Sequence, residues 1–107
     1  MWLHAKDTAE AVITIIESGK TNEIYNVSGN FEQKNIDTVN KILDLYSEEF
    51  VNYDRENLFD FTYGRDGQDV RYSVDDSKLQ ALGWKPQCNF DDELPDIVEF
   101  YRKNFIW

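Results

Sequence analysis

Residues 7–19 read DTAEAVITIIESG and give the chain its clearest structural signal, an amphipathic helix. Asp7 is a residue type that caps helices, and Glu10 three positions later completes a capping-box pattern. Gly19 stands where helices commonly end. We therefore expect a helix capped by Asp7, with one apolar face turned to a core. The residues of this face are Ala11, Val12, Ile15 and Ile16.

Six later segments complete the predicted fold. Three are rich in β-favouring or alternating apolar residues and read as extended pieces. They are residues 23–27, 58–63 and 71–74. Three others read as helices from their capping residues and apolar spacing. One begins at Asn35, one runs from Asp76 to Leu82, and the last begins at Asn89 or Asp91 with an apolar stripe of Leu94, Ile97, Val98, Tyr101 and Phe105.

The fold class predicted from these segments is α+β (α/β), a small lobe of about four helices with two or three short strands. The length of 107 residues fits one domain, so residues 1–107 are expected to form a single domain. The amount of sheet is too small for an independent α/β fold. We therefore expect a lobe that packs on something else.

Composition and charge exclude several classes of function. The net charge is −10, with 11 basic against 21 acidic residues, so binding to nucleic acid or to an anionic membrane is not expected. A small anionic ligand remains compatible, because a local pair of arginines acts over a Debye length of about 8 Å. Cys88 is the single cysteine, which excludes an intrachain disulfide and a cysteine metal site. No signal peptide or long apolar run is present, and we expect a soluble, cytoplasmic protein.

Residues 64–72, GRDGQDVRY, carry the strongest candidate for ligand binding. A guanidinium offers a bidentate fork to phosphate oxygens, and the two glycines let the backbone approach a ligand closely. Motifs for nucleotide cofactors and clusters for catalysis are missing from the sequence. His4 is the only histidine and has no partner at a catalytic spacing, so we expect it to be packed or exposed.

Seven stretches resemble, in order and spacing, the C-terminal part of the extended short-chain dehydrogenase/reductases that act on sugar nucleotides. Three of them are residues 23–30, EIYNVSGN, residues 65–75, RDGQDVRYSVD, and residues 82–86, LGWKP. The others are residues 2–7, 34–36, 78–79 and 90–94. Their shared order and spacing, rather than any one stretch, carry the resemblance. The resemblance is strongest to the dTDP-glucose 4,6-dehydratases and covers about the last third of such an enzyme.

The resemblance implies a substrate-binding lobe whose Rossmann domain is absent. In this family the Rossmann domain carries the glycine-rich NAD loop and the Tyr-x-x-x-Lys pair, so we expect no catalytic or cofactor-binding residue in this piece and NAD only in the full-length enzyme. The expected partners are an NDP-sugar and the missing Rossmann domain. An epimerase or decarboxylase lobe, or a non-catalytic module that binds a protein partner or forms a homodimer, remains an alternative.

Four residues are predicted to contact the substrate through this resemblance: Arg65, Asn35, Gln68 and Arg71. Each has a structural alternative or a departure from the family. Arg65 could instead pair with a neighbouring aspartate, Asp66 or Asp69, and Arg71 with Asp75 or Asp69. Asn35 could act only as a helix cap. Gln68 stands where similar enzymes often carry histidine, and it cannot become cationic.

Overall fold

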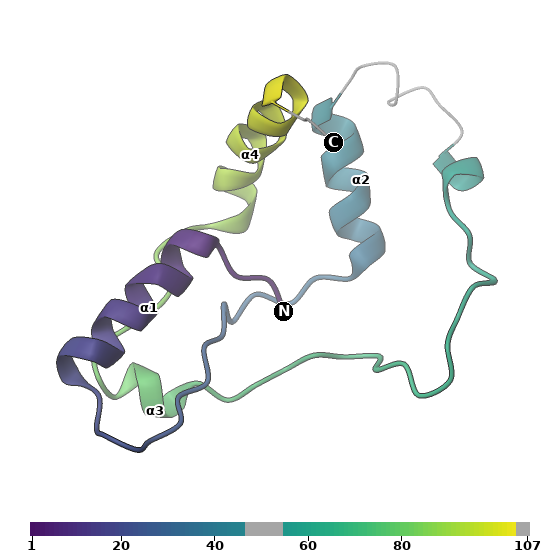
Figure 1. The fold of residues 1–107 in the computed structure, drawn as a ribbon. Coiled ribbons are helices and arrows are strands. Elements are labelled where there is room, and N and C mark those ends of the chain that lie inside the picture. The colour runs from purple at the N-terminus through teal and green to yellow at the C-terminus, as the bar shows by residue number, and fades with distance from the viewer. Residues whose placement is uncertain (47–54, 105–107) are drawn as a thin grey trace. The chain divides into compact units, whose positions relative to one another are not determined.

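The computed structural model describes residues 1–46 and 55–104. The chain divides into two compact units, residues 1–33 with 71–92 and residues 34–70 with 93–107. The helices in chain order are α1 (Ala5–Ser18), α2 (Asn35–Tyr46), the 3-10 helix η2 (Arg55–Leu58), α3 (Ser77–Gln80) and α4 (Phe90–Asn104), as Figure 1 shows. The expectation of a single domain stays a prediction.

The described residues contain four α-helices and no strand, so the predicted α+β fold with two or three strands is wrong. One isolated bridge, between Trp2 and Phe31, is the only β pairing among them. The segment 23–27 has β-favouring residues, yet within the described chain its backbone N–H groups donate no hydrogen bond. β preference reflects packing and pairing with a neighbour, so without that neighbour the segment forms no ladder.

The second expected strand, residues 58–63, is replaced by tighter local structure. Leu58 ends η2. The carboxylate of Asp60 then accepts hydrogen bonds from the backbone N–H and the hydroxyl of Thr62, at 2.9 and 2.6 Å. Aspartate side chains commonly turn the backbone in this way, which competes with an extended strand.

Helix α1 begins earlier than the sequence predicted. Its N-cap is His4, whose Nδ1 accepts the backbone N–H of Lys6 at 3.0 Å. The prediction that Asp7 caps the helix is therefore wrong, and His4 has a defined structural role. A side chain at the N-cap position that presents a hydrogen-bond acceptor can satisfy a free N–H group of the first turn. Histidine supplies that acceptor here.

Asp7 is instead buried, and it joins α1 to a distant stretch of chain. Its two carboxylate oxygens accept the backbone N–H groups of Gln87 and Cys88, at 2.9 and 3.0 Å. Burial acts to raise the pKa of Asp7, but these hydrogen bonds to the charged form outweigh it and hold the pKa below its ordinary value. The ionised form of Asp7 therefore stabilises the fold.

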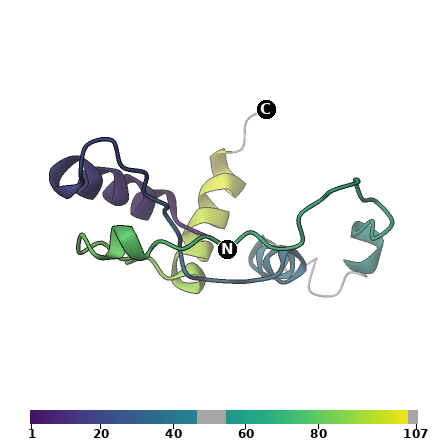
Figure 2. The same ribbon diagram turned by 90° about the horizontal axis from the view of Figure 1, so that it is seen from below.

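The core of the first unit forms where α1 meets α3 and the stretch after it. Ala11, Leu79 and Trp84 are buried there. The partly buried residues around them are Leu3, Ile15, Tyr25, Val27 and Leu82. Figures 1 and 2 both show α1 beside α3 within this unit. Alternate residues of the expected strand, Tyr25 and Val27, thus reach the core although no sheet forms.

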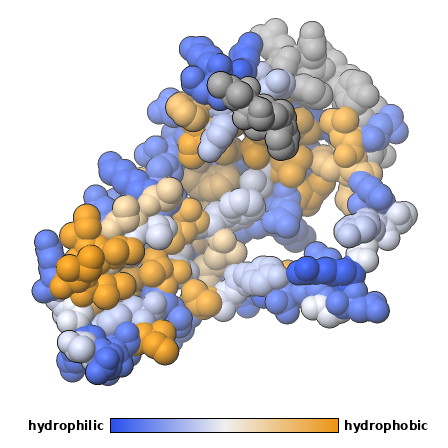
Figure 3. Space-filling view, in the orientation of Figure 1, coloured by the Kyte–Doolittle hydropathy of each residue, from blue (hydrophilic) through white to orange (hydrophobic). Residues whose placement is uncertain are grey.

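Only part of the predicted apolar face of α1 is buried. Ala11 and Ile15 contribute to the core, whereas Val12 is 49% exposed and Ile16 is 77% exposed. Figure 3 shows apolar side chains gathered over α1. The described part of the first unit buries one stripe of this helix and leaves the adjacent stripe uncovered.

The two longer helices outside that core follow the sequence prediction closely. Helix α2 covers the residues whose apolar spacing predicted a helix. Helix α4 is capped by Asn89, whose side-chain oxygen accepts the backbone N–H groups of Asp91 and Asp92. Leu94 and Val98 of the predicted α4 stripe are buried, while the predicted Phe105 lies outside the described residues. Helix α3 is shorter than expected and ends at Gln80.

Gly29 allows the chain to cross close to its own N-terminal segment. A Cβ atom at this position would overlap the carbonyl oxygen of Trp2. This close approach lies beside the bridge in which the backbone N–H of Trp2 donates to the carbonyl of Phe31 at 2.9 Å. A side chain at position 29 would therefore force two backbone segments apart.

We predict that Asp7→Asn lowers the free energy of unfolding at pH 7 by about 1.5–3 kcal/mol, because an amide replaces a buried charged acceptor of two N–H groups. The contribution of Asp7 is complete above the ordinary pKa of 3.8 and is lost as the pH falls through the lowered value of the folded protein. The difference in free energy of unfolding between the wild type and Asp7→Asn should therefore disappear below about pH 4. Urea unfolding followed by tryptophan fluorescence measures it.

Glu17→Gln is the matched control for this charge removal, because Glu17 is an exposed carboxylate of the same helix. Its stability should stay within about 0.5 kcal/mol of the wild type. An Asp7→Asn protein as stable as this control at pH 7 would contradict the role given to Asp7.

We predict that Gly29→Ala destabilises the protein by about 1–3 kcal/mol, because the new methyl group must displace a backbone carbonyl. Gly64→Ala is the control, since a Cβ there meets nothing within 4 Å and the backbone has no positive φ. Thermal unfolding monitored by circular dichroism compares the two. Equal unfolding midpoints for both variants would show that the close packing of Gly29 against the Trp2 backbone does not contribute to stability.

Candidate functional site

The candidate ligand loop is built around a tight turn at residues 65–68. The backbone N–H of Gln68 donates to the carbonyl of Arg65 at 3.2 Å. Gly67 has a φ of +73°, a conformation that glycine adopts without strain. A turn of this kind brings its first and fourth Cα atoms within about 7 Å. The structure therefore brings together two of the predicted site residues, Arg65 and Gln68.

The side chain of Arg65 is available for a ligand. Every residue from 61 to 70 is exposed. Among the described residues no carboxylate or carbonyl accepts a hydrogen bond from the Arg65 guanidinium, and no ion pair with Asp66 or Asp69 forms. The structural alternative for Arg65 is thus not realised. A guanidinium carries five N–H donors in a planar fork, so Arg65 keeps this donor capacity for a ligand.

Arg71 is held differently, because it already has an anionic partner. Its Nε donates to Oε1 of Glu32 at 2.7 Å, and a second guanidinium nitrogen lies 2.5 Å from the same oxygen. The partner expected from the sequence was Asp75 or Asp69, and that expectation is wrong. Asp75 instead accepts the backbone N–H of Ser77, which holds the pKa of Asp75 below its usual range.

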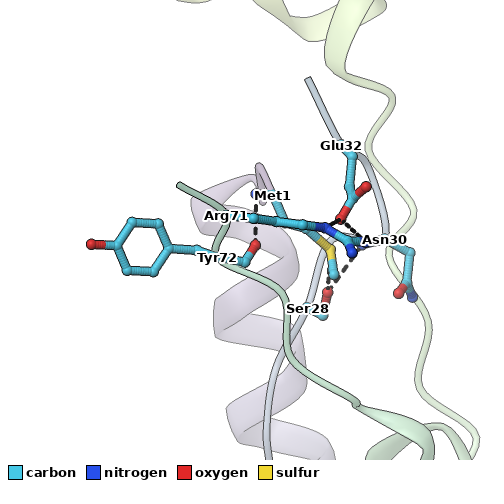
Figure 4. Close-up of polar contacts among 6 residues, drawn as sticks. All are labelled: Met1, Ser28, Asn30, Glu32, Arg71 and Tyr72. Carbon is cyan, nitrogen blue, oxygen red and sulfur yellow. Dashed lines mark hydrogen bonds and ion pairs between the residues drawn. The ribbon is translucent and has the colours of Figure 1, made fainter. Parts of the chain in front are cut away.

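Figure 4 shows that Arg71 and Tyr72 extend in opposite directions from the backbone. Arg71 runs toward Glu32, while the ring of Tyr72 points away from this cluster. The carbonyl of Tyr72 accepts the terminal amino group of Met1 at 3.2 Å. Adjacent residues of an extended backbone point to opposite sides, so only one of these two neighbours can serve a given face.

Asn35 is the first residue of α2. The carbonyl of Lys34 accepts the backbone N–H of Thr38 at 3.1 Å, so Lys34 lies at the cap position. The expectation that Asn35 caps this helix is therefore wrong. The described residues provide no hydrogen bond to the Asn35 side chain and no polar contact between Asn35 and the turn at 65–68. Asn35 and this turn belong to the second unit, whereas Arg71 belongs to the first.

Two residues beside the predicted site were missed by the sequence reasoning. Glu32 gave no local signal, because it is 39 residues from Arg71 in the chain. Tyr63 was interpreted as the end of a strand, whereas its side chain is 83% exposed two residues before Arg65. An aromatic residue next to a glycine-arginine loop was the signal that could have found it.

Neither a metal centre nor a membrane span is found in the described part of the chain. No group of three or more histidine, cysteine, aspartate or glutamate residues there is placed to hold a metal ion. None of the described helices combines the length and apolarity that crossing a bilayer requires. What the described site offers is an unpaired guanidinium on a turn, with amide and aromatic side chains near it in sequence.

Comparison with known proteins places this chain in a family. The family model described as GDP-mannose 4,6 dehydratase matches residues 1–97. The chain is 41% identical to dTDP-glucose 4,6-dehydratase 1 of Escherichia coli K12, over 99% of this chain and 30% of that protein. It is 42% identical to a probable dTDP-glucose 4,6-dehydratase of Sinorhizobium fredii, over 99% of this chain and 31% of that protein.

The human dTDP-D-glucose 4,6-dehydratase is 33% identical, over 97% of this chain and 30% of that protein. The chain therefore spans about 30% of the length of these relatives. The match to the C-terminal domain of such enzymes confirms the resemblance seen in the sequence. The chain belongs to the GDP-mannose 4,6-dehydratase family and corresponds to the C-terminal domain of its dTDP-glucose 4,6-dehydratase members.

Proposed function

We propose that this chain is the sugar-nucleotide-binding lobe of a dTDP-glucose 4,6-dehydratase, and that Arg65 binds the diphosphate of the substrate. The observation that carries the proposal is the Arg65 guanidinium, which has no partner among the described residues and lies on an exposed turn that Gly67 shapes. A free guanidinium fork matches two phosphate oxygens at once. The three relatives named above are 4,6-dehydratases of a dTDP-sugar, which supports this class of substrate.

The other three predicted residues have graded roles in this proposal. Gln68 closes the same turn and donates an amide hydrogen bond without adding charge. Asn35 contributes a neutral amide from the first turn of α2, where a helix N-terminus favours anions. Arg71 is a weaker contributor than Arg65, because the negative charge of Glu32 offsets its own.

The chemistry of the reaction belongs to the remainder of the enzyme in this proposal. NAD, bound by a Rossmann domain that lies outside these residues, would supply the redox step. The residues of this chain bind the sugar nucleotide and orient it, which lowers the entropic cost of reaction. We propose that this lobe alone has no turnover, that it works in the cytoplasm, and that its main partner is the Rossmann domain of its own enzyme.

A second candidate function is a module that binds a partner protein or a second copy of itself. The uncovered side chains of the first unit favour it, since Ile16 is 77% exposed and Ile24 is 83% exposed. Apolar surface of this kind marks contact sites on soluble proteins. Size-exclusion chromatography with light scattering separates the two functions: a stable homodimer that does not bind dTDP-glucose would favour the second.

We predict that Arg65→Ala weakens binding of dTDP-glucose by about 10- to 100-fold, because a charge-assisted contact to phosphate is lost. Isothermal titration with the protein at the length encoded by its gene measures the change. Arg102→Ala is the charge-matched control, since Arg102 is an exposed guanidinium on α4, 3.9 Å from a carboxylate of Glu99. Its affinity should match the wild type.

Arg71→Ala should reduce the affinity less than Arg65→Ala does, because Glu32 already neutralises Arg71. Equal affinities for Arg65→Ala and the wild type would remove Arg65 from the site. No measurable binding of dTDP-glucose or dTDP to the wild-type protein would overturn the proposed function itself.

A further inference from the structure

Tyr63 differs from the other aromatic residues of its loop. Phe59 and Phe61 contact each other, with ring centroids 5.8 Å apart. Tyr63 follows two residues later and is 83% exposed, and its side chain has no ring contact or hydrogen bond within the described residues. A large aromatic side chain gains little from standing alone in water. Its exposure two residues before Arg65 leaves the ring accessible to a ligand that Arg65 binds.

The spacing between Tyr63 and Arg65 suits two adjacent parts of one ligand. Two residues of chain span at most about 7 Å between their Cα atoms. The side chains of both residues are exposed on the same short stretch, just before the turn at Gly67. A ligand whose phosphates are held by Arg65 would carry its nucleoside within reach of Tyr63.

We propose that Tyr63 binds the nucleoside of the sugar nucleotide, by packing its ring against the base or ribose while Arg65 holds the diphosphate. The inference rests on the proposed function and adds a residue that determines specificity. An aromatic ring can stack on any base through its π-face, and such contacts are tolerant of base identity. Tyr63 would therefore distinguish a nucleoside diphosphate from diphosphate alone, more than it distinguishes one base from another.

The test compares two probes, dTDP and inorganic pyrophosphate, in isothermal titrations with the protein at the length encoded by its gene. Tyr63→Ala should weaken dTDP binding by about 5- to 150-fold, which is the effect expected for the loss of one aromatic contact to a base. Its binding of pyrophosphate should stay unchanged. Tyr63→Phe keeps the ring and should bind both probes as the wild type does. Arg65→Ala should weaken both probes.

Tyr101→Ala is the matched control, because Tyr101 is an exposed tyrosine of α4 that lies outside the loop. It should bind dTDP normally. Circular dichroism confirms that each variant is folded, and the conservative Tyr63→Phe variant keeps the test valid if alanine perturbs the loop.

Two outcomes would overturn the inference and leave the proposed function standing. One is a Tyr63→Ala protein that binds dTDP as the wild type does while Arg65→Ala does not. The other is an equal loss for dTDP and pyrophosphate, which would make Tyr63 a residue that only supports the turn. Failure of the wild-type protein to bind either probe would instead overturn the proposed function, and the role of Tyr63 with it.

Discussion

The buried carboxylate of Asp7 is the contact on which the first unit depends. It joins a helix near the N-terminus to backbone N–H groups that lie 80 and 81 residues further along the chain. A buried charge is tolerated only when hydrogen bonds replace the water it has lost, and two backbone donors do this here. With α1 fixed in this way, Ala11 can meet Leu79 and Trp84 and complete a small core. Since that core is small, a single polar contact has a large share in its stability.

Local charge, and not the charge of the whole chain, distinguishes the two arginines of the candidate site. The net charge of −10 would discourage an anionic ligand over long distances, but salt screens that field within about 8 Å. Arg65 has no ionic partner in residues 1–46 and 55–104, whereas Arg71 pairs with Glu32. The same residue type, six positions apart, thus has no ionic partner among the described residues in one case and is half of a surface ion pair in the other. A pair as exposed as Arg71 and Glu32 contributes little stability, about 0–1 kcal/mol.

Several β-favouring and apolar segments of the first unit lack a partner among the described residues. The segment 23–27 is β-favouring and carries an exposed Ile24, yet it pairs with no strand among the described residues. Helix α1 buries one apolar stripe and exposes the next. The relatives of this chain are more than three times as long as the part it matches. Apolar side chains and backbone groups without partners are consistent with a lobe that completes its packing against other residues.

The sequence by itself determined the helices and the candidate loop, because these depend on neighbours close in the chain. The spacing of apolar residues predicted α2 and α4, and Asn89 was correctly identified as one of two caps for α4. The glycines and Arg65 of the loop could also be found from local pattern alone. The sequence also indicated strands, and this was wrong, since a strand exists only through its partner.

Tertiary structure alone decided which polar groups meet across long separations. It placed Asp7 in a buried link to Gln87 and Cys88, and it paired Arg71 with Glu32. No local pattern encodes these contacts, because each joins residues that only folding brings together. The cap at His4 differs, because its Nδ1 accepts the backbone N–H of Lys6 only two residues away. Whether an arginine is free to bind a phosphate is therefore decided by the fold, while its presence in a glycine-rich turn is decided by the sequence.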